Sequence, residues 1–270
     1  MDEKEIIQTV VEETAKNSVG KIIDGIGSFF GKICLPAAEE YGLYLRDKVH
    51  IYRLINLNKI VNKTKVLIKD KEIVSNISPK GLIEFIDRSS WNEDDVIQNM
   101  WAGLLAGEIT NSSQTDSNFL YYNLLNEINP YQSRLIKLIF KDDRICTSLQ
   151  PLKLENLYNE LNLQEQISIP IRKILEIAPK PLDYIVQGHK HQDIINNEDD
   201  HFLALGYLLP NITHLRRLEI IKSYVISHKE RTITFDPTLT GLDFYMNCTG
   251  LKVYPLEAYL VTRKYWLERK

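Results

Sequence analysis

The stretch Leu215-Arg216-Arg217-Leu218-Glu219-Ile220-Ile221 decides the predicted fold of the C-terminal half, because it ends a helix and leads directly into two short strand candidates. Segments 223–227 and 232–235 contain β-branched and aromatic residues and are separated by four polar residues, which is a hairpin signal. Asp236-Pro237-Thr238 then predicts the cap of a last helix over 239–248. Helix, hairpin and closing helix in this order are typical of the end of a winged helix.

The predicted winged-helix-like unit covers residues 129–250. A helix over 131–140 and a helical segment over 154–163 are expected to supply its first two helices. Between them and the final hairpin, we interpret residues 164–199 as an insertion, within which Pro170 begins a short helix. The predicted fold class is therefore mainly α-helical, with a short β-hairpin in this C-terminal unit.

Residues 36–128 are predicted to form a helical body, and residues 251–270 a C-terminal tail. In the body, Glu93-Asp94-Asp95 supplies the acidic first turn of a helix, where negative charge favours the positive end of the helix dipole. We interpret Trp91 and Trp101, on either side of this helix start, as core aromatics. The body therefore precedes the winged-helix-like unit as a separate helical domain.

Residues 1–35 form a predicted amphipathic N-terminal helix, which contains several glycines and ends just before Pro36. Two interpretations remain open for its apolar face. It either covers the following helix in a hairpin hinged near Pro36, or lies on an anionic membrane as a peripheral contact. The residues of this face are Ile22, Ile26, Phe29 and Phe30.

A long basic helix is predicted to follow, over 37–69. Between positions 46 and 71 the chain has eight Lys or Arg against two Asp, an excess of six positive charges. These side chains face water if the hairpin forms, or anionic lipid headgroups if the segment meets a membrane. The positions singled out on this basic helix are Arg46, Lys48, Arg53, Lys59 and Lys63.

Composition limits the classes of function. The chain of 270 residues is 44% hydrophobic and 26% charged, which indicates a globular protein. Its formal net charge of −3 gives no overall attraction to polyanions, so a nucleic-acid or lipid surface requires local charge segregation. The chain has three cysteines, Cys34, Cys146 and Cys248, which are far apart, and this favours reduced thiols and a cytoplasmic location. In the membrane interpretation of the N-terminal helix, the protein would also contact the inner membrane peripherally.

Several motifs along the chain occur together. They are Pro36-Ala37-Ala38-Glu39-Glu40, Trp91-Asn92-Glu93-Asp94-Asp95, Met100-Trp101-Ala102-Gly103-Leu104-Leu105-Ala106, Leu208-Leu209-Pro210-Asn211 and Leu239-Thr240-Gly241-Leu242. Together these motifs resemble the Abi-alpha (abortive infection alpha) family of bacterial anti-phage proteins. The resemblance implies a role in phage defence and carries over no catalytic residue. Residues 218–221 read Leu-Glu-Ile-Ile, where the resemblance leads us to expect Leu-Gly-Leu-Ile.

Basic and polar residues gather on the last part of the winged-helix-like unit. A DNA-binding protein of this kind places one helix in the major groove and reaches the phosphates with other elements. The alternative is a protein-interaction module in which Arg216 and Arg217 pair with acidic residues of the body. The predicted contact residues under either alternative are Thr213, His214, Arg216, Arg217, Lys222, His228, Lys229 and Arg231.

Motifs for catalysis, metals or cofactors are not found in the sequence. It lacks a Gly-rich dinucleotide or phosphate loop, a nucleophile elbow and a His-Glu-x-x-His motif. His189 and His191 lie two apart in a predicted loop, a spacing that fits no metal signature. The sequence therefore favours a non-enzymatic component of antiphage defence that acts by protein recognition or self-association. A DNA-binding regulator and a membrane-acting effector are the alternatives.

Overall fold

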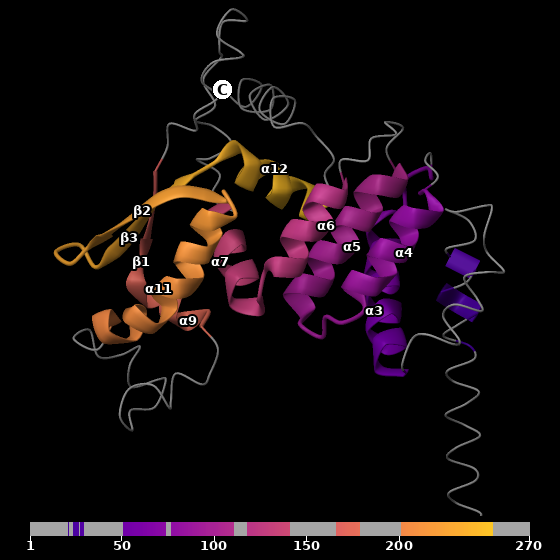
Figure 1. Ribbon diagram of the computed structural model, residues 1–270, viewed down its shortest axis with the longest axis horizontal. Coiled ribbons are helices and arrows are strands. Elements are labelled where there is room, and N and C mark those ends of the chain that lie inside the picture. The colour runs from indigo at the N-terminus through magenta and orange to yellow at the C-terminus, as the bar shows by residue number, and fades with distance from the viewer. Residues whose placement is uncertain are drawn as a thin grey trace, which may run out of the picture. The chain divides into compact units, whose positions relative to one another are not determined.

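In the part of the chain that it describes, the computed structural model consists of helices and one small sheet towards the C-terminus (Figure 1), so the predicted mainly α-helical fold is confirmed. The chain divides into two compact units, which we describe separately. Unit 1 comprises residues 1–127 together with 248–252, and unit 2 comprises residues 128–247 and 253–270. The residues that the structure describes are 21, 24–26, 28–29, 51–73, 77–110, 118–140, 166–178 and 201–250.

Unit 1 contains four described helices besides a few N-terminal residues. They are α3 (Ile51–Leu67), α4 (Pro79–Ser89), α5 (Asp95–Thr110) and α6 (Asn118–Glu127). Sequence signals explain where two of them begin. The Ser78 hydroxyl accepts a hydrogen bond from Gly81 N at 3.1 Å at the start of α4. The Asp94 carboxylate accepts from Val96 N at 3.0 Å and Ile97 N at 3.2 Å, so this first-turn acid caps α5.

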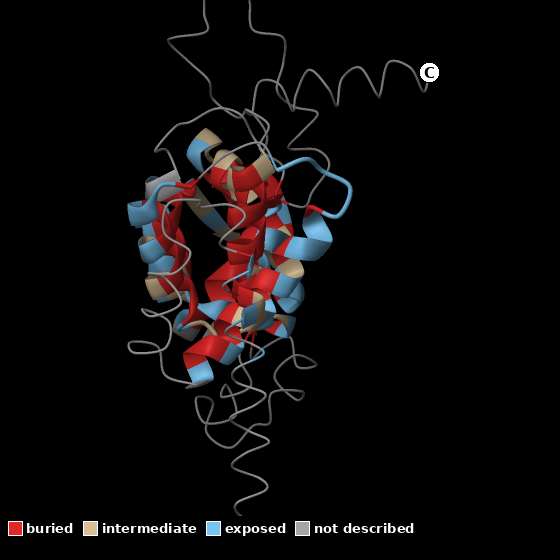
Figure 2. Cartoon of the chain, turned by 90° about the vertical axis from the view of Figure 1, so that its right-hand side faces the viewer, coloured by how far each residue is buried: buried red, intermediate tan, exposed pale blue. Residues whose placement is uncertain are grey.

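Helix α5 is the centre of unit 1, because it is apolar on nearly every side and 11 of its 16 residues are buried. Its Trp101 is fully buried and packs against Phe85 and Tyr122, with ring centroids 5.6 and 5.5 Å away. Figure 2 shows the buried residues along the inner sides of the helices and the exposed ones outside. The core interpretation of Trp101 is correct, whereas Trp91 is 58% exposed and is not a core residue.

Gly103 in α5 allows a close backbone approach within unit 1. A Cβ built on this glycine would lie 2.5 Å from the carbonyl carbon of Cys248 and 2.9 Å from the backbone N of Gly250. Gly250 itself has a φ of 77°, in the left-handed region that glycine adopts without strain. The small residues of this part of α5 therefore create space for residues 248–250.

Unit 2 begins with α7 (Pro130–Phe140), whose first turn carries a reciprocal cap. The Asn129 side chain accepts from Gln132 N at 2.9 Å, and the Gln132 side chain accepts from Asn129 N at 3.0 Å. The same two side chains reach helix α11 (His201–Arg217). Asn129 Nδ2 donates to Asn211 Oδ1 at 2.7 Å, and Gln132 Nε2 lies 3.0 Å from His214 Nδ1. One capping motif thus begins α7 and joins it to α11.

The sheet of unit 2 has three antiparallel strands in the order β1-β3-β2. The predicted hairpin is confirmed as β2 (Ile221–Ser227) and β3 (Thr232–Pro237), each slightly longer than expected. Strand β1 (Ile167–Pro170) pairs with β3 and was not predicted, because its alternation extends over only four residues, which is too short a run to indicate a strand. Helix α9 (Ile171–Glu176) follows it directly, as the position of Pro170 indicated. Both elements lie within the segment 164–199.

The sheet presents one buried and one polar face. On the buried face, Phe235 and Ile233 of β3 are fully covered and pair with Ile167 and Ile169 of β1. On the opposite face, Ser168 Oγ and Thr234 Oγ1 are 2.8 Å apart. Helix α12 (Leu239–Cys248) follows β3, and the Thr238 hydroxyl accepts from Gly241 N at 2.9 Å, as the predicted cap requires.

The turn between α11 and β2 explains how the helix ends at the predicted place. Ile220 N donates to Leu215 O at 3.0 Å and Glu219 N donates to Arg216 O at 3.1 Å, which is the Schellman pattern of a helix C-terminus. The residue at its left-handed position is Glu219, with a φ of 58°. Glycine is favoured there, and the Leu-Gly-Leu-Ile exit expected from the family resemblance has glycine at this position.

Candidate functional site

The predicted contact residues of unit 2 lie on α11, on β2 and in the turn between β2 and β3. Two of them are used inside the unit. Thr213 Oγ1 lies 3.2 Å from the hydroxyl of Tyr224 on β2, and His214 Nδ1 lies 3.0 Å from Gln132 on α7. Both residues are half-buried. Thr213 and His214 therefore join α11 to its neighbours in the fold.

A second group, which we call the helix-exit cluster, consists of Arg216, Arg217 and Lys222. All three residues are exposed. Their side chains form no ion pair or hydrogen bond within the part of the chain that the structure describes. The alternative in which Arg216 and Arg217 pair with acidic residues of the body stays a prediction. Glu219, which is also exposed, lies between these cations along the chain.

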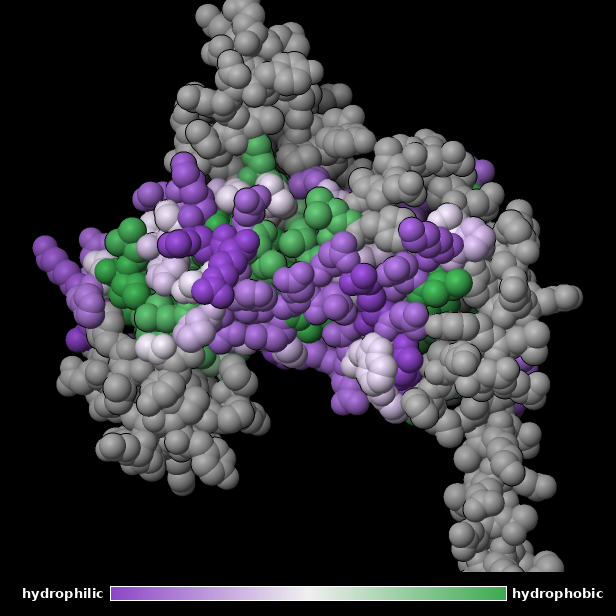
Figure 3. Space-filling model, viewed as in Figure 1, coloured by the Kyte–Doolittle hydropathy of each residue, from purple (hydrophilic) through white to green (hydrophobic). Residues whose placement is uncertain are grey.

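A third group, the wing tip, consists of His228, Lys229 and Arg231 in the turn after β2. The turn is held by Glu230 N, which donates to Ser227 Oγ at 3.2 Å. Arg231 has a φ of 54°, and its carbonyl accepts from Ile171 N at 2.9 Å. Figure 3 shows hydrophilic side chains where the hairpin ends, at the left of the view. The wing tip is therefore a polar projection anchored to the start of α9.

The helix-exit cluster and the wing tip are far apart. Strand β2 runs from Lys222 to the wing tip, and an extended chain rises by about 3.3 Å per residue, so about 20 Å separates the two groups. An acidic residue lies among the residues of each group along the chain, Glu219 in the helix-exit cluster's segment and Glu230 in that of the wing tip. The predicted contact residues consequently form two small mixed-charge groups instead of one continuous basic surface.

Gly206 and Pro210 are two residues without polar side-chain atoms on the exposed side of α11. Gly206 and Pro210 are exposed and lie one helical turn apart, on the same side of the helix as Arg217. A Cβ built on Gly206 would meet no atom within 4 Å. Neither residue has a side-chain hydrogen-bond donor or acceptor, and recognition of base edges in a DNA groove requires such groups.

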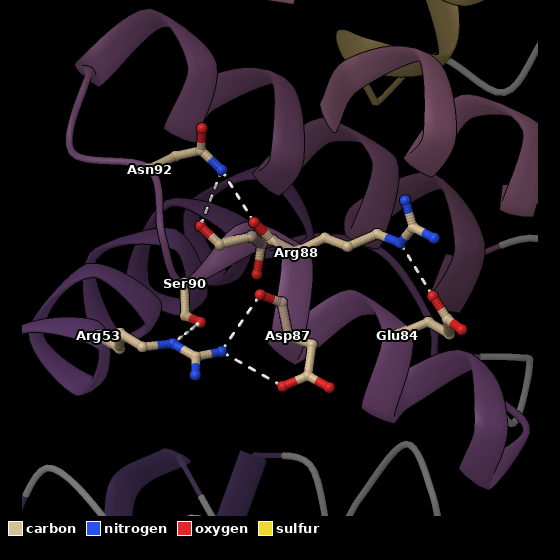
Figure 4. A network of polar contacts seen from close by, with 7 residues as sticks. Arg53, Glu84, Asp87, Arg88, Ser90 and Asn92 are labelled. Atoms are coloured by element: carbon tan, nitrogen blue, oxygen red, sulfur yellow. Dashed lines mark hydrogen bonds and ion pairs between the residues drawn. The ribbon is translucent and has the colours of Figure 1, made fainter. Parts of the chain in front are cut away.

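On the basic helix, Arg53 has a structural role, because it is 7% exposed. Its guanidinium donates to Ser90 Oγ at 3.0 Å and forms an ion pair with Asp87 at 3.3 Å, as Figure 4 shows. The guanidinium also lies 4.4 Å from the ring centroid of Trp91. Asn92 Nδ2 donates to Arg88 O at 3.0 Å in the same network. These contacts fix the connection between α4 and α5.

The other singled-out cations of this helix differ in their surroundings. Lys63 Nζ lies 2.5 Å from Asp95 Oδ1, and its hydrogen bond holds the pKa of this carboxyl below its usual value. Lys59 is exposed and also lowers the pKa of Asp95 through its charge. Arg46 and Lys48 lie outside the described residues. Among the described cations of this set, Arg53 and Lys63 thus form ion pairs within unit 1.

The described residues of the N-terminal apolar face are buried. Ile26 is fully covered, Phe29 is nearly so, and Lys65 Nζ of α3 lies 5.5 Å from the Phe29 ring centroid. Ile22 and Phe30 lie outside the described residues. These contacts favour packing on α3, as in the hairpin interpretation, while peripheral membrane contact stays a prediction. No described helix is both long and apolar enough to cross a membrane.

His189 and His191 lie outside the residues that the structure describes. Within the described ranges, no three His, Cys, Asp or Glu residues come together as a metal site would require. The Cys248 thiol is buried, which raises its pKa well above the usual value. A buried thiol with a raised pKa is a poor nucleophile, so Cys248 acts as a small core residue.

Fold and surfaces together define a mainly helical protein whose second unit carries a three-stranded antiparallel sheet. A family model described as Abortive infection alpha matches residues 52–242, from the first turn of α3 into α12. The chain therefore belongs to the abortive infection alpha family, which indicates abortive-infection-type defence. No curated protein and no solved structure matches the chain.

Proposed function

We propose that the protein is a non-enzymatic component of abortive-infection-type defence, and that unit 2 is a winged-helix-like module that recognises a protein partner. The order α7, β1, α9, α11, β2, β3 supports this interpretation of unit 2. In such a module α11 takes the place of the recognition helix and β2 with β3 forms the wing. The recognition surface would then be the exposed side of α11 with the helix-exit cluster at its end.

One observation carries the choice of a protein over DNA. The exposed side of α11 presents Gly206 and Pro210, which lack polar side-chain atoms for base readout. The absence of a side chain at Gly206 permits close approach of a partner's side chains, and Arg217 on the same side of the helix offers a cation for an acidic residue at the rim. The helix-exit cluster, with the carboxylate of Glu219 among its cations, also fits a mixed-charge protein surface better than a uniform row of phosphates.

The test is recovery of partners by tagged full-length protein from phage-infected and uninfected cells. Charge reversal by Arg216→Glu with Arg217→Glu should reduce recovery of a protein partner by about tenfold, because it opposes the charge complementarity of the interface. Lys173→Glu, on the exposed side of α9, is the matched control and should leave recovery unchanged. Equal recovery by both variants contradicts the assignment of the surface.

A DNA-binding regulator is the second candidate, because Arg216, Arg217 and Lys222 are exposed and form no ion pairs with described residues. A gel-shift titration with duplex DNA tests it. Binding through phosphates falls steeply between low and moderate salt concentration. A salt-dependent shift that disappears in the Arg216→Glu, Arg217→Glu variant would favour DNA, and absence of a shift at low salt supports the protein partner.

A further inference from the structure

Strand β2 forms one edge of the three-stranded sheet of unit 2. The strand order β1-β3-β2 places β3 in the middle, so β2 pairs with β3 on one side and has a second, outer side. Within the described residues, no backbone hydrogen bond joins this outer side to another segment. The hairpin of β2 and β3 projects from unit 2 at the left of Figure 1. The unpaired donors and acceptors of an edge strand can pair with a further strand.

The pairing of the sheet determines which backbone groups of β2 point to this outer edge. Along a strand, the N–H and C=O groups of successive residues alternate between its two sides. Ile171 N donates to the Arg231 carbonyl at 2.9 Å, so the odd-numbered residues of β3 direct these groups towards β1. The even-numbered residues of β3 direct them towards β2, where their partners are residues 223, 225 and 227. Tyr224 and Ile226 therefore direct N–H and C=O to the outer edge.

The two edges of the sheet differ in how well they accept another strand. At the opposite edge, the outward residues of β1 are Ser168 and Pro170, and proline has no N–H to donate. Natural edge strands are often protected by proline, lysine or a bulge. Strand β2 has a bulge between Ile221 and Ser223, but residues 223–227 contain neither proline nor a charged side chain. This part of β2 is therefore the open edge of the sheet.

The side chains beside the β2 edge indicate the chemistry of the strand that fits it. Val225 is 62% exposed, so an apolar or β-branched side chain placed next to it would bury apolar surface. The edge begins at Lys222, which belongs to the helix-exit cluster. The three exposed cations of this cluster outnumber Glu219, the acid that lies among them along the chain. An extended segment with β-branched residues and an acidic end matches both features.

A second copy of β2 fits this edge less well. Antiparallel pairing about a two-fold axis at Val225 would match the outward groups of Tyr224 with those of Ile226 in the other copy. The same register places position 222 opposite position 228, where the wing tip begins. Lys222 would then approach a segment that contains Lys229. Cations facing cations oppose association, so charge favours a different, acidic partner.

We propose that the outer edge of β2 binds an extended segment of a protein partner as a fourth strand. The segment has β-branched side chains beside Val225 and acidic side chains at the end near Lys222. This proposal rests on the recognition of a protein by unit 2 and specifies the form in which the partner binds. In this mode main-chain hydrogen bonds provide affinity, and the side chains on either face of the added strand provide specificity.

Ile226→Pro tests the edge directly, because this N–H points outward and its loss leaves the hydrogen bonds between β2 and β3 in place. Ile226→Ala is the matched control, since it shortens the same half-buried side chain and keeps the N–H. The probe is the fluorescently labelled peptide Asp-Asp-Val-Thr-Val-Thr-Val-Asp-Asp, and fluorescence anisotropy measures its binding to the full-length protein. We expect Ile226→Pro to bind at least about fivefold more weakly than Ile226→Ala. Equal affinities, or no binding by the wild type, overturn the proposal.

Two changes to the peptide test the assigned chemistry. A peptide with lysine in place of every aspartate should bind at least about fivefold more weakly, because it opposes the helix-exit cluster. A peptide that is N-methylated at its valines and threonines cannot donate the main-chain hydrogen bonds of a strand and should not bind. Equal binding of the lysine peptide contradicts the acidic partner, and binding of the methylated peptide contradicts strand addition.

Amide hydrogen exchange of the wild type, resolved by NMR, does not depend on whether a variant folds. The amides of Val225 and Ser227 face β3 and should be protected without peptide. Those of Tyr224 and Ile226 should exchange rapidly in the free protein and slow by at least about tenfold with bound peptide. Protection of Tyr224 and Ile226 in the free protein would mean that the chain itself covers this edge, which overturns the proposal.

Recovery of partners from phage-infected cells separates this proposal from the function proposed for unit 2. If the wild type recovers no protein, protein recognition itself is contradicted. If Arg216→Glu with Arg217→Glu reduces recovery while Ile226→Pro and Ile226→Ala recover the partner equally, recognition stands and strand addition is overturned. A dimer in sedimentation velocity that Ile226→Pro alone abolishes would mean that a second copy occupies the edge, which also overturns the proposal.

Discussion

Replacing Gly103 by alanine changes one methyl group at the point where residues 248–250 meet α5. The new Cβ would lie 2.5 Å from the carbonyl carbon of Cys248 and 2.9 Å from the backbone N of Gly250. Carbon atoms in contact normally lie about 3.5–4.0 Å apart. Both obstacles are backbone atoms, so no side-chain rotation relieves the overlap. We therefore expect the helix and residues 248–250 to move apart or this contact to be lost.

The magnitude follows from two opposing contributions. Alanine is favoured over glycine inside a helix by about 1 kcal/mol, which by itself would stabilise the variant. Overpacking of a rigid core typically costs about 1–3 kcal/mol and occasionally more. Because the overlap at Gly103 is with backbone and exceeds 1 Å, we expect the upper end of this range. The net loss is then about 2 kcal/mol in the free energy of unfolding.

Urea and thermal unfolding, followed by circular dichroism, measure the effect. A loss of this size lowers the melting temperature by about 4–8 °C for a chain of this length. Gly206→Ala is the matched control, since this glycine is also helical and a Cβ there meets no atom within 4 Å. It should raise stability by about 0.5–1 kcal/mol. If Gly103→Ala is as stable as Gly206→Ala, the inferred close approach at Gly103 is refuted.

Three further predictions follow from single positions. Glu219→Gly should stabilise the protein by about 1 kcal/mol in urea unfolding, because the residue has a φ of 58°; an unchanged midpoint would contradict the assigned backbone conformation. Arg53→Met should lose about 1–3 kcal/mol and alter the tryptophan fluorescence of the protein, because the hydrogen bond to Ser90, the ion pair with Asp87 and the cation beside Trp91 disappear; unaltered emission would show that the guanidinium does not face the ring. The lowered pKa of Asp95 means that its ion pair with Lys63 stabilises the fold above the ordinary carboxyl pKa of 3.8 and loses this contribution as the pH falls below it. In an NMR titration, Lys63→Met should raise the pKa of Asp95, and an unchanged value would count against the ion pair.

Local signals allowed several features to be predicted from the sequence. The hairpin was predicted because polar turn residues separate two short runs of strand-forming residues, and its position is correct within two residues. The acidic helix start at Glu93-Asp94-Asp95 and the cap within Asp236-Pro237-Thr238 were predicted because such signals act within a single turn, and the structure identifies Asp94 and Thr238 as the capping residues. Strand β1 was missed, since its four residues become a strand only by pairing with β3, far along the chain.

Local patterns failed where the environment of a side chain depends on distant residues. Arg53 was predicted to belong to an exposed basic surface, yet the α4–α5 connection surrounds it with Asp87 and Ser90. Trp91 was predicted to be buried, yet the same network leaves it at the surface. Of the predicted contact residues, His214 is used to hold α11 to α7 through Gln132. No pattern at these positions reports the partner, because the partner lies more than 30 residues away in each case.

The sequence by itself determined the helical class, the C-terminal hairpin and the family, because each depends on periodicity, turn residues and motifs that are local in the chain. Only the tertiary structure decided which charges are free. It pairs Arg53 and Lys63 within unit 1, and it leaves Arg216 and Arg217 exposed at the end of α11. The physical reason is that burial and ion pairing are set by neighbours that folding brings together, and a charge pattern along the chain does not contain them.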